Sequence, residues 1–225
     1  MNEQYPKHIA IILDGNRRFA KARNLPSFKG HEAGADTVEK LLDWAKELNV
    51  KELTLYTLST ENLKRTKEEV DYLFKLMKKW FDKLKNDKRV HENKVKVRFV
   101  GELSLLPKDL RDLCLEIENK TSSYNNYIIN FCIAYGGRLE LLEAIKKLKG
   151  KKEITEEDVS KALWLSSEPD MIIRTGGVKR LSNFLPWQSV YSEFIFLEKM
   201  WPEFTKHDLI ACIDEFKSRK RNFGK

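Results

Sequence analysis

The chain has 225 residues, of which 41% are hydrophobic and 34% charged, and its formal net charge is +8. This composition is typical of one globular domain, here residues 1–225, with a sizeable core, and it argues against disorder. No apolar run approaches the roughly 20 residues that span a bilayer, so any membrane contact should be peripheral. The positive charge suits nucleic acid, an anionic membrane surface or diphosphates, although most lysines could simply lie on solvated helix faces.

Strand-like and helix-like patterns alternate along the chain. We expect strands over residues 9–13, 53–58, 95–100, 127–134, 171–173 and 194–197. Helical spacing of apolar residues predicts helices over 32–48, 70–84, 110–117, 139–148 and 205–220, and Thr155 with Asp158 reads as the capping box of a short helix. The alternation predicts an α/β fold, a single domain with a mostly parallel six-stranded sheet flanked by helices on both faces.

The first strand ends on a group of residues suited to binding a metal and a diphosphate. Asp14 can hold a divalent cation, and Gly15 lets the backbone approach a ligand closely. Arg17 and Arg18 can bind phosphate oxygens, together with exposed amides. Ligands of open α/β sheets bind beyond the carboxyl ends of the strands, which is where this group lies. The alternative interpretation is an ordinary Asp-Gly turn.

Further polar and basic residues follow two other predicted strands, and a parallel sheet would bring all three groups to one rim. The Arg174-Thr-Gly-Gly loop is typical of a flexible anion-binding segment. Structural alternatives remain for Arg65, which could pair with Glu68 or Glu69, for His31, which could cap a helix, and for Glu61 with Asn62, which could form a turn. The three groups are Asn16, Arg17, Arg18 and His31; Ser59, Glu61, Asn62 and Arg65; and Arg174, Arg180 and Ser182.

The three cysteines, Cys114, Cys132 and Cys212, lie far apart within apolar stretches. Their spacing fits no metal site, and their odd number without a signal-peptide pattern predicts buried free thiols in a reducing cytoplasm.

Residues 8–18 and 170–193 together resemble the cis-prenyltransferase family, whose best-known members are undecaprenyl diphosphate synthases, and the resemblance extends from about residue 8 to 224. It implies a Mg²⁺-dependent transferase that condenses isopentenyl diphosphate with an allylic prenyl diphosphate. Each step forms a cis double bond, and the product is a polyprenyl diphosphate that serves as a lipid-carrier precursor. It also implies an apolar tunnel and a homodimer. The basic surface favours peripheral contact of this cytoplasmic protein with anionic lipid at the inner face of the membrane.

The resemblance also implies roles for single residues. Asp14 and Glu193 would hold Mg²⁺, while Ser59 and Asn62 would lie near the reacting carbons. The allylic diphosphate would contact Gly15, Asn16, Arg17, Arg18, His31 and Arg65; isopentenyl diphosphate would contact Arg174, Arg180 and Ser182; and Phe19 and Leu63 would complete the substrate site. The segment Arg221–Gly224 loosely matches an element that reaches into the neighbouring subunit's site.

The hydrocarbon chain would need an apolar wall. The helical face that includes Val70, Phe74 and Phe81 is one candidate, the face of Leu110, Leu113 and Ile117 is another, and ordinary core packing is the alternative for each residue.

Several positions depart from the common bacterial pattern of the family. Phe19 stands in place of Trp, Leu63 in place of another aromatic residue, Leu58 in place of Phe, Lys179 in place of His, and Ser27 in place of Arg, with Arg23 or Lys29 as substitutes that are out of register. These changes leave the allylic primer, the product length and the acceptor open.

Two other function classes were weighed against an enzyme that uses isopentenyl diphosphate. A non-catalytic partner subunit would have lost Asp14 and much of the anion loop, which this chain keeps. A nucleic-acid-binding protein would show a recognisable motif or a basic stripe, whereas the basic residues here cluster at strand ends, so we expect no nucleic-acid partner.

Overall fold

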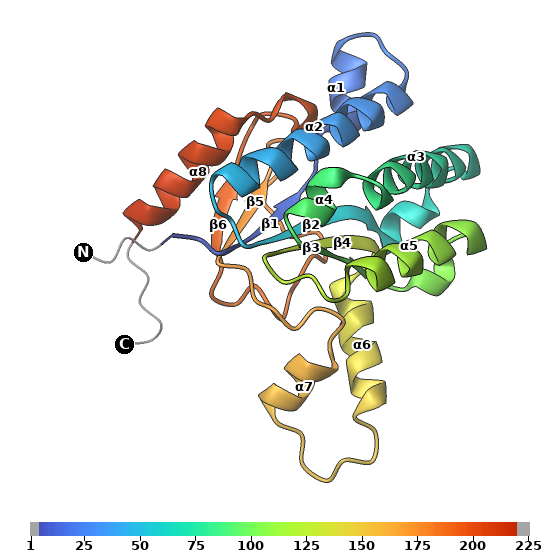
Figure 1. The fold of residues 1–225 in the computed structure, drawn as a ribbon, viewed down its shortest axis with the longest axis vertical. Coiled ribbons are helices and arrows are strands. Elements are labelled where there is room, and N and C mark those ends of the chain that lie inside the picture. The colour runs from blue at the N-terminus through green and yellow to red at the C-terminus, as the bar shows by residue number, and fades with distance from the viewer. Residues whose placement is uncertain (1–4, 220–225) are drawn as a thin grey trace.

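The computed structural model describes residues 5–219, and the segment Arg221–Gly224 therefore lies outside the described residues. Its centre is a six-stranded sheet in the order β3-β4-β2-β1-β5-β6, in which every pairing is parallel (Figure 1). This confirms the predicted α/β architecture. The strands are β1 (His8–Ile12), β2 (Glu52–Ser59), β3 (Val95–Val100), β4 (Tyr127–Tyr135), β5 (Met171–Arg174) and β6 (Glu193–Phe196).

The strand order reverses beside β1, because β2 pairs with one edge of β1 and β5 with the other. Such a switch point leaves a crevice at the carboxyl ends of the two diverging strands. Ile12 of β1 lies in register with Arg174 of β5, so the residues that follow β1 and the end of β5 meet at this crevice.

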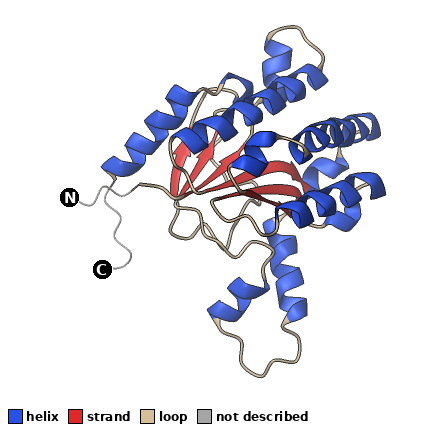
Figure 2. Ribbon diagram, viewed as in Figure 1, coloured by secondary structure: helices blue, strands red, loops and turns tan. Residues whose placement is uncertain are grey.

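Helices cover mainly one face of the sheet (Figure 2). Apolar residues of α2, α3, α5 and α8 pack there in the larger core, which explains the wide apolar faces of these helices. The prediction of helices on both faces holds only in part, because the other face packs mostly against loop residues such as Leu165, Phe184 and Leu185. The helices are α1 (Asn16–Ala22), α2 (Ser27–Glu47), α3 (Lys67–Lys85), α4 (Lys88–Glu92), α5 (Lys108–Thr121), α6 (Gly137–Lys147), α7 (Glu156–Ala162) and α8 (Lys206–Ser218).

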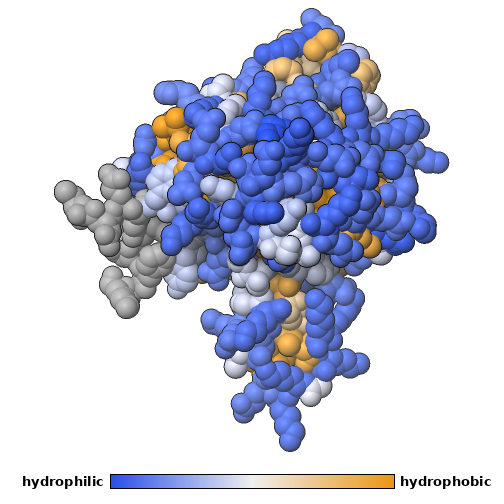
Figure 3. Space-filling model, in the orientation of Figure 1, coloured by the Kyte–Doolittle hydropathy of each residue, from blue (hydrophilic) through white to orange (hydrophobic). Residues whose placement is uncertain are grey.

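The α6–α7 hairpin projects from the body of the molecule (Figure 1). Apolar side chains gather on it in Figure 3, and Leu142, Ile145 and Ile154 are exposed there. Thr155 and Asp158 form the predicted capping box at the start of α7. All three cysteines are buried and free, as predicted. Over residues 5–219, none of the helices is both long and apolar enough to cross a membrane.

Candidate active site

Asp14 follows β1 and lies between two guanidinium groups. Its Oδ2 accepts a hydrogen bond from Nη2 of Arg174 at 2.8 Å, and its Oδ1 lies 3.2 Å from Nη2 of Arg18. The backbone carbonyl of Asp14 accepts hydrogen bonds from Thr175 Oγ1 at 2.8 Å and from the Trp201 amide at 2.9 Å. The main chain therefore holds the carboxylate in place at the switch point, with its side chain 30% exposed.

Gly15 makes the tight turn between Asp14 and α1. Its φ is +111°, a left-handed conformation that disfavours any residue with a Cβ. A Cβ at this position would also lie 2.8 Å from the Cβ of Met200. The Asp-Gly pair is thus a turn, and this turn delivers the Asp14 carboxylate and the two following arginines to the crevice.

Arg174 is the buried cation of the site, with 5% of its surface exposed. Its Nη1 donates to Ser182 Oγ at 2.8 Å and also to the Arg180 carbonyl oxygen. Ser182 and Asn183 both adopt positive φ, at 51° and 67°. The loop after β5 therefore folds back around the guanidinium.

The end of β2 contributes a compact turn, which is followed by Arg65. Ser59 and Asn62 cap each other: Ser59 Oγ accepts from the Asn62 amide at 3.1 Å, and Asn62 Oδ1 accepts from the Ser59 amide at 3.2 Å. The turn alternative for Asn62 is therefore observed. Both side chains nevertheless line the pocket beside Asp14, as does Glu61, which accepts from Asn183 at 2.9 Å.

Glu69 of α3 approaches two arginines and one histidine of the site. Its Oε1 lies 2.9 Å from Arg65 Nη1, 3.7 Å from His31 Nε2 and 3.9 Å from Arg17 Nε. The predicted alternative partner of Arg65 is thus present. His31 lies inside α2 and does not cap it. Burial lowers the pKa of His31, and the positive charge of Arg65 lowers it further, so the imidazole is neutral near pH 7.

Three hollows meet at this place. One polar pocket of about 710 Å³ extends from Asp14 along α1 to Ser27, and another of about 610 Å³ extends from Asp14 to Arg174, Arg180 and Ser182. An apolar cavity of about 140 Å³ runs between α2 and α3. All three are lined by Leu13, Asn16 and His31, so the two polar pockets and the apolar cavity join at one junction.

The donor atoms at this junction fit a Mg²⁺ ion that arrives with a diphosphate, and they do not fit a metal cage made by this chain alone. Within residues 5–219, no cluster of three His, Cys, Asp or Glu side chains could hold a metal. Mg²⁺ is commonly held by one or two carboxylates together with substrate phosphates and waters. Asp14 supplies one such carboxylate, and the surrounding arginines supply the charge that a diphosphate requires.

The structure does not bring Glu193 to this junction. Glu193 begins β6, in register with Met171, whereas Arg174 at the other end of β5 pairs with Phe196. Its carboxylate accepts a hydrogen bond from Arg219 at 2.7 Å, beyond the end of α8. Asp14 and Glu193 of one chain therefore cannot share a cation, because the parallel register places Asp14 at the carboxyl ends of the strands and Glu193 at their amino ends.

Phe19 and Leu63 are also outside the two polar pockets. Phe19 packs under the Arg23 guanidinium, whose carbon lies 3.8 Å from the ring centroid, and Leu63 packs against the larger core. Arg23 pairs with Glu203 at 2.9 Å, so it does not replace the arginine missing at Ser27. Lys29 is likewise paired, with Glu32 at 2.8 Å.

Two residues of the site escaped the sequence analysis. Lys21 lines the pocket along α1, as Ser27 does, and adds a cation to that pocket. Lys21 lies one turn after Arg17 and Arg18 on α1, and this position could have identified it. The spacing of apolar residues, however, did not predict this short helix. Glu69 was considered only as a surface partner of Arg65, yet it also approaches His31 and Arg17.

Comparison with known proteins identifies the family. The family model described as putative undecaprenyl diphosphate synthase matches residues 12–224. A tritrans,polycis-undecaprenyl-diphosphate synthase (geranylgeranyl-diphosphate specific) of Pyrococcus abyssi is 47% identical over 98% of this chain and 87% of the relative. The protein of the same name from Methanocaldococcus jannaschii is 40% identical over 99% of this chain and 84% of the relative.

Two solved structures support the same family assignment. A lavandulyl diphosphate synthase from Lavandula x intermedia, in complex with dimethylallyl diphosphate, aligns with a TM-score of 0.91 and 30% identity over 98% of this chain and 99% of its own. A probable undecaprenyl diphosphate synthase from Campylobacter jejuni aligns with a TM-score of 0.85 and 37% identity over 100% of both chains. The chain therefore belongs to the undecaprenyl diphosphate synthase family of cis-prenyltransferases.

Proposed function

We propose that this cis-prenyltransferase condenses isopentenyl diphosphate with geranylgeranyl diphosphate and repeats the step to build a polyprenyl diphosphate. The choice of primer is supported by the names of the archaeal relatives that are 40–47% identical to this chain. The observation that carries the proposal is the junction at Asp14, where two basic pockets of similar size meet one apolar cavity. One catalytic domain, residues 1–225, would perform the whole reaction.

The two basic pockets suit two diphosphates that must react without being pushed apart by their own charge. The pocket along α1, with Arg17, Arg18 and Lys21, would take the allylic diphosphate. The pocket with Arg174 and Arg180 would take isopentenyl diphosphate. The allylic hydrocarbon would then enter the apolar cavity past Leu13, Asn16 and His31. Buried Asn16 Oδ1 has no hydrogen-bond partner among the described residues, which leaves it available to a ligand, and His31 Nε2 lies 3.7 Å from Glu69 Oε1.

In the reaction, the allylic C–O bond breaks and the diphosphate leaves with the electron pair. The double bond of isopentenyl diphosphate attacks the resulting allylic cation, a carbon–carbon bond forms, and loss of a proton creates the new cis double bond. Arg17, Arg18 and Arg65 would stabilise the charge on the departing diphosphate, an effect of several kcal/mol when donors are preorganised. Mg²⁺, held by Asp14 and diphosphate oxygens, would add positive charge at the same oxygens.

The test is to incubate the purified full chain with Mg²⁺, labelled isopentenyl diphosphate and geranyl, farnesyl or geranylgeranyl diphosphate, and to weigh the products by mass spectrometry. We expect a ladder of C5 additions, with geranylgeranyl diphosphate as the fastest primer. No extended product with any primer would overturn the proposal.

A second acceptor is supported by the structural match to a synthase solved with dimethylallyl diphosphate. The same assay therefore includes a sample with dimethylallyl diphosphate as the sole substrate. A coupled product in that sample would favour an acceptor other than isopentenyl diphosphate.

We also propose a homodimer, which the family resemblance implies, and peripheral contact with the membrane. A homodimer would give Glu193 and the segment Arg221–Gly224 a second site to reach. Support comes from β6, which is an edge strand preceded by Val190 and Tyr191 with 70% and 59% of their surfaces exposed. Sedimentation of an active monomer would contradict it. The net charge of +8 suits peripheral contact of a cytoplasmic enzyme with anionic lipid, which flotation with anionic vesicles would detect.

A further inference from the structure

The loop that follows β5 brings Arg180 and Ser182 to their pocket in a strained conformation. Ser182, Asn183 and Leu185 have φ values of +51°, +67° and +48°. None of these residues is a glycine, and a left-handed backbone is disfavoured for residues with a Cβ, although less so for asparagine. Strain of this kind persists only where the surrounding contacts hold the backbone in place. The contacts of this loop therefore decide how Arg180 and Ser182 face the pocket.

Aromatic packing anchors one part of the loop. Phe184 is fully buried, and its ring stacks on that of Tyr56 in β2 with the centroids 4.5 Å apart. The Tyr56 hydroxyl donates a hydrogen bond to the Ser182 carbonyl oxygen at 3.2 Å. Leu185 is fully buried as well. These contacts hold the loop against the sheet.

Asn183 anchors the same loop with three hydrogen bonds that reach two distant segments of the chain. Its carbonyl oxygen accepts from the Gly137 amide at 2.8 Å, and its side-chain Oδ1 accepts from the Arg138 amide at 2.9 Å. Its Nδ2 donates to Oε1 of Glu61 at 2.9 Å. One asparagine thus joins the loop after β5 to the start of α6 and to the 3₁₀ turn Thr60–Lys64 after β2.

The two bonds to α6 replace a cap that this helix lacks. The first amides of a helix have no partner inside it, and Gly136 at the N-cap position has no side chain that could accept from them. Asn183 accepts from two of these amides instead. The fit is close, because a Cβ on Gly136 would lie 2.8 Å from Asn183 Nδ2 and 2.7 Å from Thr60 Oγ1. The three segments therefore meet without room for a further side-chain atom.

The bond from Asn183 to Glu61 has a charged acceptor. Burial raises the pKa of Glu61, but hydrogen bonds from its own amide, from Asn183 and from two neighbouring hydroxyl groups outweigh this effect, so the pKa is lowered. The carboxylate is therefore ionised near pH 7. Hydrogen bonds to an ionised acceptor are stronger than those between neutral groups, so this contact is a firm link between the two loops.

We propose that Asn183 is a positioning residue for isopentenyl diphosphate, because it holds the loop in the conformation in which Arg180 and Ser182 face the pocket. The inference rests on the proposed function, which assigns this pocket to isopentenyl diphosphate. Asn183 lines that pocket and does not line the pocket along α1. Arg65, which ends the 3₁₀ turn, has a partner of its own in Glu69 at 2.9 Å. Loss of the Asn183 side chain should therefore weaken binding of isopentenyl diphosphate and spare the allylic diphosphate.

The first test is Asn183→Gly in the full chain, because glycine keeps the left-handed backbone and removes the side chain with its two hydrogen bonds. We expect the KM for isopentenyl diphosphate to rise by about tenfold, since the ligand must then order the loop itself. The KM for geranylgeranyl diphosphate should change by less than about twofold, and kcat should fall much less than the affinity, because the cations that stabilise the departing diphosphate belong to the other pocket.

The matched control is Asn49→Gly. Asn49 is an exposed asparagine with φ of +54°, and it lines neither polar pocket nor the apolar cavity. The chemical change is the same, so both KM values should equal those of the wild type. Thermal unfolding shows whether each variant is folded. A folded Asn183→Gly variant whose isopentenyl diphosphate KM matches that of the control, or whose two KM values rise together, would overturn the proposal.

A second pair of variants tests the bond to Glu61 and carries the test if Asn183→Gly does not fold. Asn183→Asp keeps the shape of the side chain and its Oδ1, but it replaces the donor with an oxygen, so that two carboxylates face each other. Adding Glu61→Gln supplies a donor from the opposite side and returns the charge of the pair to that of the wild type. We expect Asn183→Asp to raise the KM for isopentenyl diphosphate and the double variant to recover most of this loss. A double variant that binds no better than Asn183→Asp would overturn the proposal.

A binding measurement separates this inference from the proposed function. Isopentenyl diphosphate is titrated calorimetrically with Mg²⁺ and without a primer, so that no turnover takes place. Asn183→Gly should bind it about tenfold more weakly than the wild type, a difference of about 1.4 kcal/mol. A wild type that binds isopentenyl diphosphate but extends no primer would refute the proposed function alone. Equal affinities of the wild type and Asn183→Gly would refute the positioning role alone.

Discussion

Asp14→Asn separates the catalytic role of this carboxylate from its structural one. The change keeps the shape of the side chain and removes only its charge. Arg174, whose side chain is 6% exposed, keeps its bonds to Ser182 and to the Arg180 carbonyl, and the asparagine oxygen can still accept from it. What is lost is the charge-assisted part of the bond to Arg174 and the ion pair with Arg18 at 3.2 Å, at a position that is 30% exposed and therefore partly screened.

The expected cost in stability is about 1.5 kcal/mol, because hydrogen bonds to charged groups contribute about 1.5–3 kcal/mol and part of this bond survives. For a chain of this size, that lowers the melting temperature by about 3–6 °C. The expected cost in activity is larger, about 100- to 1000-fold in kcat, since the charge acts where the diphosphate departs. Activity should also respond to Mg²⁺ only at higher concentrations.

The assay pairs calorimetry with initial rates of labelled isopentenyl diphosphate incorporation over a Mg²⁺ titration. Glu203→Gln is the matched control, because its ion pair with Arg23, at 2.9 Å and 34% exposure, lies outside the pockets. That variant should lose a similar or smaller amount of stability and keep its activity. If Asp14→Asn lost no more activity than its unfolded fraction explains, the reasoning about this carboxylate would be wrong.

Three further predictions follow from the same geometry. Gly15→Ala should lower the free energy of unfolding by at least about 2 kcal/mol and abolish activity, because the φ of +111° and the close approach to Met200 both forbid a Cβ. Gly150 is the control, with φ of +92° and no neighbour within 4 Å. In denaturant unfolding, Gly150→Ala should lower the free energy of unfolding by only about 1 kcal/mol. The folded-state pKa values of His31 and His8 are lowered by burial, so both residues bind more protons when unfolded, and the free energy of unfolding should fall as pH drops below about 6.5. His31→Gln should reduce that slope without removing it, and an unaltered slope would contradict the assignment. EDTA should abolish turnover yet leave the melting temperature unchanged, since residues 5–219 contain no three-ligand metal cluster; a melting temperature that fell on chelation would reveal a resident metal.

The convergence of the site could be predicted from the sequence because parallel strands place their carboxyl ends at one rim. Asp14 and Arg174 lie 160 positions apart and still form an ion pair, since the register of β1 and β5 leaves no other arrangement. The pairing register between neighbouring strands, however, cannot be predicted from the local pattern of residues. The family resemblance assigned Glu193 to the metal site, but Glu193 begins its strand and therefore lies at the opposite end of the strands from Asp14.

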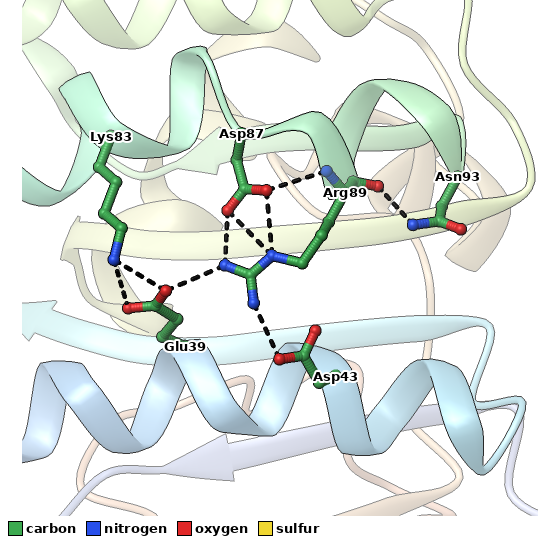
Figure 4. Close-up of polar contacts among 6 residues, drawn as sticks. All are labelled: Glu39, Asp43, Lys83, Asp87, Arg89 and Asn93. Carbon is green, nitrogen blue, oxygen red and sulfur yellow. Dashed lines mark hydrogen bonds and ion pairs between the residues drawn. The ribbon is translucent and has the colours of Figure 1, made fainter.

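The sequence pattern also failed to predict short helices and charged contacts between helices. α1 has seven residues, only one of which is buried, so it lacks the apolar repeat that identifies a helix. The ion pairs of Arg89 are hidden for a similar reason: Arg89 lies on a five-residue helix, and its partners Glu39 and Asp43 belong to another helix about 50 positions earlier (Figure 4). Charge patterns within one helix can be recognised in a sequence, whereas charge pairs between helices depend on packing.

The solitary carboxylate at the switch point has a thermodynamic consequence. Because this chain alone brings one carboxylate to the junction, free Mg²⁺ would bind weakly, and the ion's affinity would reside mostly in its complex with pyrophosphate oxygens. Linkage then requires that each species raise the other's affinity by the same factor. Occupancy would therefore follow the product of both concentrations, and the proposed enzyme would take up prenyl diphosphate and metal together.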